Sequence, residues 1–198
     1  WFDENPIAGP TAVLGDEMAI DGDGVIHLIQ YDGWGLATLY KNSDDGGLTF
    51  SQVVVFGASS AGYVSVPTPK IGVTGDHYGC AIATGADGKV GLLITDQGGN
   101  AYLAESGDYG VTWDTTTAAN GLPACVTAVT DFAPIDTNMV GGDPDNIRTD
   151  RFGDLMYDAN NNAHAVFEAA YWLNEVSVYN DRNPWPGYGI DLPYPVDY

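Results

Sequence analysis

Carboxylates are the side chains of this sequence with the richest potential chemistry, and several recur at short spacing. Asp143 and Asp145 lie two residues apart in Asp-Pro-Asp-Asn, and Asp21 and Asp23 have the same spacing in Asp-Gly-Asp-Gly. Hard cations such as Ca²⁺ select oxygen ligands at spacings of this kind. The glycines favour a plain β-turn for Asp21 and Asp23. For Asp143 and Asp145 two interpretations stay open, a Ca²⁺ site and solvated loop acids.

A hydrolytic site cannot be assigned from the acids alone. A glycosidase needs two opposed carboxylates, but among 27 acidic residues some pair always meets that condition. His27 and His164 fall in predicted strands, where packed and hydrogen-bonded core positions are expected. Cys80 and Cys125 follow no zinc-binding spacing, and one disulfide or two buried thiols account for them equally well.

The net charge of −21 limits the partners that the chain can bind. Six Lys and Arg residues face 22 Asp and five Glu, and an excess of Asp over Glu is typical of turn-rich proteins. Such a field repels nucleic-acid phosphates and anionic membrane surfaces, and no apolar run approaches the ~20 residues of a membrane span. We therefore expect neither nucleic-acid binding nor membrane insertion. Ca²⁺ binding and adaptation to high salt both remain explanations of the acidity.

Two eight-residue segments, 63 positions apart, are near-copies of each other. The first box, residues 43–50, reads SDDGGLTF, and the second box, residues 106–113, reads SGDYGVTW. Such residues suit a hairpin turn, because Gly tolerates positive φ while Asp and Ser side chains accept backbone N–H bonds. We expect the outgoing strands to start at the threonines. Structural turn roles are predicted for the ten matched residues: Ser43, Asp45, Gly47, Thr49, Phe50, Ser106, Asp108, Gly110, Thr112 and Trp113.

Both boxes resemble the Asp box, or BNR repeat, of sialidase-like β-propellers, and the resemblance covers about two units through their turns. It implies an all-β fold of propeller-like blades, each with four antiparallel strands. Around each box the pattern is strand, glycine-containing turn, strand, turn, strand, box and strand. The chain is therefore expected to be one segment, 1–198, with units at about 12–56, 78–117 and 152–180.

The third unit lacks a matching box. It repeats strand, turn and strand over residues 155–167, with His164 one residue out of register with His27, and continues with a strand at 175–179. Three units do not close a propeller, which typically needs 4–8 blades. We expect an incomplete ring that further blades of a larger protein, a partner chain or a symmetry mate completes. A smaller β-domain that closes by other means is the alternative.

Three tryptophans are candidate ligand or interface residues. Trp34 lies in a glycine-flanked loop, Trp172 lies between two predicted strands, and Trp185 belongs to an extended tail, 184–198, rich in Pro and Tyr. Exposed rings stack on sugars or anchor protein interfaces. The same rings are equally suited to fill the space between blades.

The family resemblance does not bring an active site with it. Sialidase-like hydrolases use three arginines for the substrate carboxylate, a Tyr–Glu nucleophile pair and an Asp acid/base, and their arginine motif is absent here. Fold similarity alone does not transfer function. We therefore expect a non-catalytic extracellular or cell-surface segment that binds glycan or protein or assembles a larger secreted protein. The alternative is a part of a sialidase-like glycoside hydrolase whose catalytic residues lie outside this chain.

Overall fold

The computed structural model describes residues 17–31, 37–57, 64–66, 77–96, 100–131, 147–173 and 176–177. These residues form strands, turns and loops and contain no helix, which confirms the all-β prediction. Within these ranges no helix is long and apolar enough to cross a membrane. The described part of the chain is therefore organised entirely by sheet packing.

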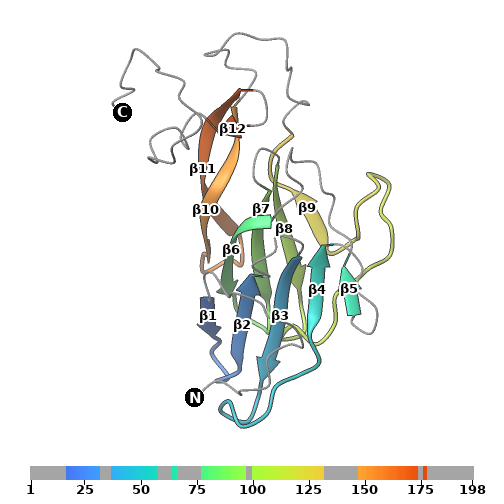
Figure 1. The fold of residues 1–198 in the computed structure, drawn as a ribbon. Helices are drawn as coiled ribbons and strands as arrows, with labels where there is room; N and C mark the ends of the chain where they lie inside the picture. The colour runs from blue at the N-terminus through green and yellow to red at the C-terminus, as the bar shows by residue number, and fades with distance from the viewer. Residues whose placement is uncertain are drawn as a thin grey trace.

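The strands form three sheets in which chain order and spatial order agree (Figure 1). The first sheet has β1 (Glu17–Ile20), β2 (Ile26–Tyr31), β3 (Ala37–Ser43), β4 (Val54–Gly57) and β5 (Val64–Val66). The second has β6 (His77–Thr84), β7 (Val90–Asp96), β8 (Ala101–Ser106) and β9 (Val126–Ala128). The third has β10 (Ile147–Tyr157), β11 (Ala163–Leu173) and β12 (Val176–Ser177). Neighbouring strands are antiparallel except β4 and β5, which are parallel.

The strand that follows each box starts later than predicted. β4 begins at Val54 and β9 at Val126, so the expectation that Thr49 and Thr112 open these strands is wrong. Both threonines instead hydrogen-bond back into their own box. After the second box the chain makes a loop in which Asp114 caps Thr116 and an isolated bridge joins Thr117 to Pro123. β5 and β9 consequently fall beyond the predicted unit ends at 56 and 117.

In each sheet a turn of five residues joins the first two strands, at 21–25, 85–89 and 158–162. The strand pairs that close these turns are Ile20 with Ile26, Thr84 with Val90, and Tyr157 with Ala163. The fourth turn residue always has positive φ: 85° at Gly24, 77° at Gly88 and 60° at Asn161. Asn is the side chain that tolerates this region best after Gly. His27 and His164 therefore occupy the same position, and the predicted one-residue offset between them is wrong.

Apolar side chains fill the seam between the first and second sheets. Side chains alternate between the two faces of a strand. The even-numbered residues of β6 and β7 therefore face the odd-numbered residues of β2 across this seam. Trp113 is at the centre, with its ring edge-on to Tyr40 at 5.2 Å and to Phe56 at 4.8 Å between centroids. The buried cluster comprises Ile29, Tyr40, Val54, Phe56, Val66, Ile82, Val90, Leu92, Ile94, Tyr102, Ala104, Trp113, Leu122, Cys125 and Val126.

The seam between the second and third sheets uses smaller residues. Ala81, Ala83, Leu93, Ala101 and Leu155 form its buried cluster. Tyr157 lies over the position of Gly91, where a Cβ atom would overlap the Tyr157 hydroxyl. That hydroxyl donates a hydrogen bond of 2.7 Å to Glu105, which also pairs with Lys89 at 2.9 Å. Glycine at 91 is therefore what lets the third sheet approach the second.

Cys80 and Cys125 are both thiols in the structure, Cys125 buried and Cys80 half-buried. Both pack on the core between the first and second sheets. Burial raises the pKa of Cys125 to about 11, which keeps it protonated and unreactive at neutral pH.

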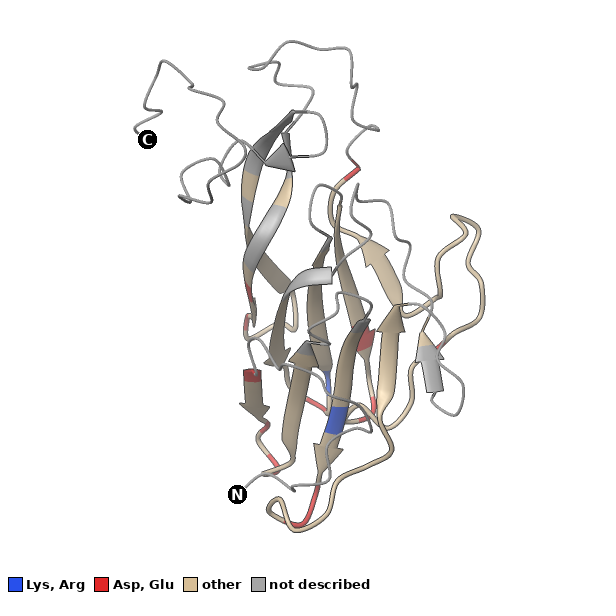
Figure 2. Cartoon of the chain, viewed as in Figure 1, with Lys and Arg blue, Asp and Glu red and all other residues tan. Residues whose placement is uncertain are grey.

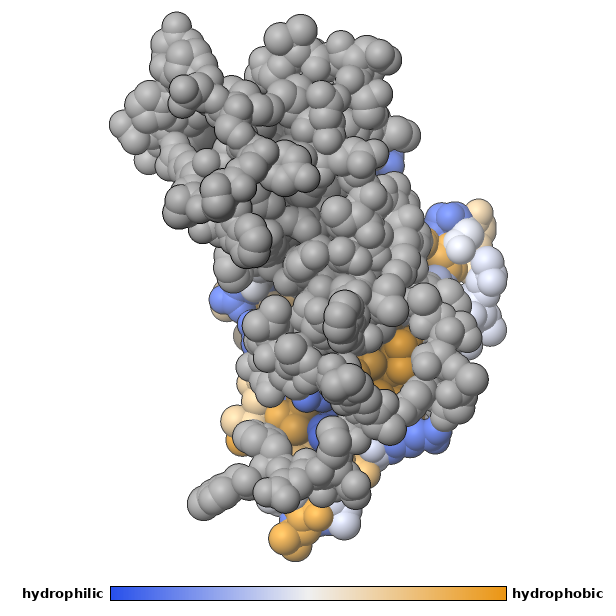
Figure 3. Space-filling model, viewed as in Figure 1, coloured by the Kyte–Doolittle hydropathy of each residue, from blue (hydrophilic) through white to orange (hydrophobic). Residues whose placement is uncertain are grey.

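Acidic residues in the described part gather mainly in the turns, as Figure 2 shows. Apolar side chains also reach the surface, and several are visible in Figure 3. The large exposed ones are Met18, Ile20, Leu48, Val111, Val129, Met156 and Val166. Met18 and Ile20 lie on the first sheet and Met156 and Val166 on the third, so both outer sheets of the series have exposed apolar side chains.

Candidate functional site

The two boxes share four internal hydrogen bonds. In the first, Ser43 donates to Asp45 Oδ1 at 2.8 Å and accepts from the Gly47 N–H at 2.8 Å. Thr49 donates to both Asp45 oxygens, through its N–H at 2.9 Å and its hydroxyl at 2.6 Å. The second box repeats every bond with Ser106, Asp108, Gly110 and Thr112 at 2.7, 3.1, 2.9 and 2.6 Å.

These bonds also set the ionisation of the box acids. Hydrogen bonds from the Thr49 side chain and backbone, and from Ser43, lower the pKa of Asp45 to about 2. Burial acts to raise the pKa of Asp108, but the bonds from Thr112 and Ser106 outweigh it and lower that pKa. Both carboxylates are acceptors committed to their own turns, so neither is a proton donor for chemistry.

Tyr109 is the one difference between the boxes that has a geometric cost. It has φ 63°, where the first box has Gly46 at 76°. A bulky residue in this left-handed region is strained and needs compensating contacts. The Tyr109 hydroxyl donates to Asp23 Oδ2 at 2.8 Å, and its carbonyl accepts from Asn42 Nδ2 at 2.7 Å. Tyr109 therefore joins the second box to the first turn and to β3.

A buried polar chain lies directly beneath this contact. Asp21 Oδ1 accepts the N–H groups of Asp23 and Val25, both at 2.9 Å, while Oδ2 lies 3.2 Å from His27 Nε2. His27 Nδ1 lies 2.9 Å from the Tyr40 hydroxyl, which is also 3.3 Å from the Tyr109 carbonyl. His27 and Tyr40 are both buried. The chain thus runs from the first turn through two strands to the second box.

Burial decides the protonation of this chain. Desolvation lowers the pKa of His27, and the hydrogen bond and charge of Asp21, which act to raise it, do not reverse the shift. Neutral His27 then donates from Nε2 to Asp21, and its Nδ1 and the Tyr109 carbonyl share the single Tyr40 hydroxyl proton as acceptors. For Asp21, burial acts to raise the pKa, but the bonds from His27, Val25 and Asp23 lower it overall. Burial raises the pKa of Tyr40, so its hydroxyl stays protonated.

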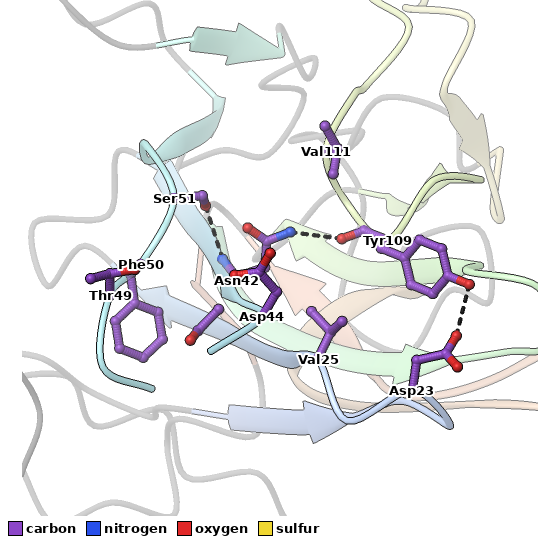
Figure 4. A pocket seen from close by; sticks show the side chains of 10 residues that line it. Asp23, Val25, Asn42, Asp44, Thr49, Phe50, Ser51, Tyr109 and Val111 are labelled. Atoms are coloured by element: carbon purple, nitrogen blue, oxygen red, sulfur yellow. Dashed lines mark hydrogen bonds between the residues drawn. The ribbon is translucent and has the colours of Figure 1, made fainter. Parts of the chain in front are cut away.

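An open pocket of about 460 Å³ lies where the two boxes meet the first turn (Figure 4). Its volume falls within the range of small-ligand sites. Asp23 and Tyr109 are hydrogen-bonded on one side, Asn42 and Ser51 on another, and the Phe50 ring forms a third part of the wall (Figure 4). The lining comprises Asp23, Val25, Asn42, Ser43, Asp44, Thr49, Phe50, Ser51, Tyr109 and Val111.

The lining of this pocket combines acidic, hydroxyl and aromatic side chains. None of the lining residues, all of which lie in the described ranges, is basic. Asp23 and Asp44 are exposed side chains of this lining. The Asp21–His27–Tyr40 chain has the order of a nucleophile-activating relay, but Tyr40 is buried and protonated, so it presents no nucleophile to the pocket.

The structure brings some of the predicted site residues together and leaves others untested. Ser43, Thr49 and Phe50 line the pocket, while Trp113 packs in the seam. Asp143, Asp145, Trp34 and Trp185 lie outside the described residues, and Trp172 lies on β11 with its side chain outside them. Among described residues, no three His, Cys, Asp or Glu side chains are placed to hold a metal ion.

The Asp21–His27 pair was missed as a unit, although a sequence signal for it exists. Asp158 and His164 have the same six-residue spacing, the same turn and the same contact, with 3.4 Å between His164 Nε2 and Asp158 Oδ2. His164 is exposed, so its expected core position is wrong, whereas His27 is buried as expected. Asn42 and Tyr109 carried no such signal, because their contact joins residues 67 positions apart.

Comparisons with known proteins do not assign the chain to a family. No protein-family model matches it, and no curated protein matches it either. The site must therefore be interpreted from its own geometry.

Proposed function

We propose that this chain is a non-catalytic segment of an Asp-box β-propeller, of about three blades, and that the pocket between its boxes binds a neutral glycan. The support for the blade interpretation is the repeated architecture: three sheets in chain order, three turns of equal length and two boxes that share four hydrogen bonds. An extracellular or cell-surface location belongs to the proposal and is supported by the resemblance of the boxes alone.

One observation carries the ligand class. The pocket combines carboxylate and hydroxyl groups with the rings of Phe50 and Tyr109, and it has no basic lining residue. Carboxylates accept hydrogen bonds from sugar hydroxyls, and aromatic rings offer flat apolar surface beside them. A sialylated or sulfated glycan would bring negative charge next to Asp23 and Asp44 in a chain of net charge −21. Neutral sugars therefore fit this pocket better than acidic ones.

The test is an array of neutral and sialylated oligosaccharides, followed by titration calorimetry with the best neutral binder. Asp44→Asn removes one exposed lining carboxylate and is expected to weaken binding at least about tenfold, the effect of ~1.4 kcal/mol. Asp131→Asn is the control, because Asp131 is an exposed acid outside the pocket.

Three results would contradict the proposal. They are equal binding by the wild type and Asp44→Asn, a preference for lysine-rich peptides over every sugar on the array, and release of chromophore from nitrophenyl glycosides. The last result would revive the alternative of a glycoside hydrolase.

A further inference from the structure

We propose that this chain associates head to tail with a second copy of itself, with the exposed face of β10–β11 packing on the outer face of β1. This inference rests on the blade arrangement of the proposed function but not on its ligand pocket. The two faces are called here the receiving face, with Met156, His164 and Val166, and the entering face, with Met18 and Ile20.

The receiving face has the composition of an interior seam but is open. In each sheet the second strand begins right after the turn, at Ile26, Val90 and Ala163. Three residues further along lie Ile29, Leu93 and Val166, which are therefore equivalent positions in the three sheets. Ile29 is buried under the second sheet and Leu93 under the third, whereas Val166 is 71% exposed. Met156, beside it on the same face, is also exposed. A further sheet packed on this face would bury Val166, just as the second sheet buries Ile29 and the third sheet buries Leu93.

The entering face is the complementary half of the same seam. Met18, Ile82 and Leu155 are also equivalent, because each lies two residues before the last residue of its strand at the turn. Ile82 is buried where the second sheet enters the first, and Leu155 is buried where the third enters the second, but Met18 is 56% exposed. Ile20 is exposed next to it. Exposed side chains of this size, gathered on one face, are characteristic of interaction surfaces.

Polar groups repeat the pattern at the receiving face. In the first sheet the Asp21–His27 pair lies beneath the second box, whose Tyr109 carbonyl it approaches through Tyr40. The third sheet presents the equivalent Asp158–His164 pair with His164 exposed. The first sheet of another copy has a box of its own, residues 43–50, in the place equivalent to the second box. The structure therefore holds both halves of a third seam of the kind it already forms twice.

A second copy is the occupant that the molecule itself specifies. Both halves of the seam are on one chain and at opposite ends of its sheet series, which is the condition for a heterologous interface. Two copies would bring together about six sheets, within the range of roughly 4–8 blades that closes a ring. Closure would cover both exposed faces of each copy at once.

Electrostatics opposes this association at low salt. Each copy has a net charge of −21, and the repulsion between them is screened over ~10 Å at 0.1 M salt and ~3 Å at 1 M. Association is therefore expected to strengthen with added NaCl, as apolar packing predicts and an ion-paired interface would not.

Sedimentation velocity in 0.5 M NaCl over a hundredfold concentration range tests the proposal. The expected wild-type mass rises toward twice the 20.9 kDa of one chain. Val166→Lys and Met18→Lys each place a charge in the interface and are expected to weaken association at least about tenfold. Both positions are exposed, so circular dichroism and thermal melting should match those of the wild type.

Leu48→Lys is the matched control. Leu48 is 85% exposed, and its equivalent in the second box, Val111, stays 70% exposed at a seam that is already formed. The proposal therefore expects Leu48→Lys to associate like the wild type. Loss of association in this variant would place the contact elsewhere and overturn the proposal.

Mixing the two variants separates head-to-tail contact from a symmetric one. The receiving face of Met18→Lys and the entering face of Val166→Lys are both intact, so the mixture is expected to recover one interface and form dimers. No recovery would indicate that like faces meet, and a monomeric wild type would mean that the occupant is not a second copy; either result overturns the proposal. Glycan binding by monomeric Val166→Lys would show that the pocket functions without association, so the two proposals fail separately.

Discussion

At the residue scale, the side chains that organise this molecule are polar ones with several partners. Ser106 is buried and accepts from the Gly110 N–H while donating to Asp108. Asp21 accepts two backbone N–H groups and a histidine. Such residues fix the turns by satisfying backbone groups that have no ladder partner. Removing one of them leaves a buried donor without an acceptor.

Ser106→Ala is expected to lower the free energy of unfolding by about 1–3 kcal/mol, because the buried Gly110 N–H loses its acceptor. Urea unfolding followed by Trp fluorescence measures the effect. Thr115→Ala, at an exposed residue just past the box, is the control and is expected to change stability by less than about 0.5 kcal/mol. Equal stability of Ser106→Ala and the control would show that the box serine is dispensable.

His27 makes stability depend on pH in a defined direction. Its pKa in the folded state is lowered from 6.5, chiefly by burial, so below pH 6.5 the unfolded chain takes up a proton that the folded chain does not. The stabilisation is complete above pH 6.5 and is lost as pH falls toward the folded pKa, with a slope of at most about 1.4 kcal/mol per pH unit. His27→Gln is expected to flatten this slope between pH 5 and 6.5. Urea midpoints at half-unit steps decide the matter, and an unchanged slope would exclude His27 as its origin.

At the element scale, sheet packing depends on one position that differs between the sheets. The position held by His27 and His164 is Gly91 in the second sheet. Tyr157 fills the space that the missing side chain leaves. Gly91→Ala is therefore expected to destabilise the protein by about 1–3 kcal/mol through overpacking. Gly107→Ala, where a Cβ atom would meet nothing within 4 Å, is the control, and thermal unfolding compares the two.

A second substitution shows whether the clash at Gly91 acts through Tyr157. Tyr157→Leu removes the hydroxyl and outer ring that the new Cβ would meet. In the double variant Gly91→Ala with Tyr157→Leu, the alanine is expected to cost much less than it does alone, a coupling of about 1 kcal/mol. Strictly additive effects would mean that the third sheet is not positioned by this contact.

Sequence predicted the local parts of the elements and missed the parts set over long distances. β3 and β8 have the expected ends because a box follows each of them, and box chemistry is local. The late starts of β4 and β9 depend on contacts such as Ser51 with Asn42, nine residues apart, which no turn dipeptide announces. The parallel pairing of β5 is a tertiary contact without a local pattern. The pocket could be predicted only in part, since Ser43, Thr49 and Phe50 belong to a box but Asn42 and Tyr109 meet across two sheets.

At the scale of the whole molecule, the charge of −21 is a source of self-repulsion that salt relieves. Raising NaCl from 0.02 to 0.5 M is expected to increase Tm by about 3 °C, which corresponds to ~1 kcal/mol for a domain of this size. Differential scanning calorimetry at low protein concentration measures this without contribution from association. A Tm that is independent of NaCl would show that the acids are arranged without net repulsion.

Calcium separates the two explanations of the acidity. At equal ionic strength, CaCl₂ is expected to raise Tm more than NaCl if Asp143 and Asp145 bind the ion, because a ligand that binds only the folded state stabilises it. The variant carrying Asp143→Asn and Asp145→Asn should lose that difference and keep the NaCl response. Identical Tm values in the two salts would leave solvated loop acids as the interpretation of this pair.

The glycines of the second sheet favour one order of the units. If a copy of the middle unit followed the middle unit, its Thr84 would take the place of Tyr157, because the two residues are equivalent. Thr84 is smaller than Tyr157 and would leave a void above Gly85 and Gly91. Duplication of that unit alone is therefore expected to destabilise the fold. The first and third units both have the Asp–His pair that the middle unit lacks. Gene fusions or deletions that keep the Gly91–Tyr157 match are therefore expected to fold more readily than those that break it.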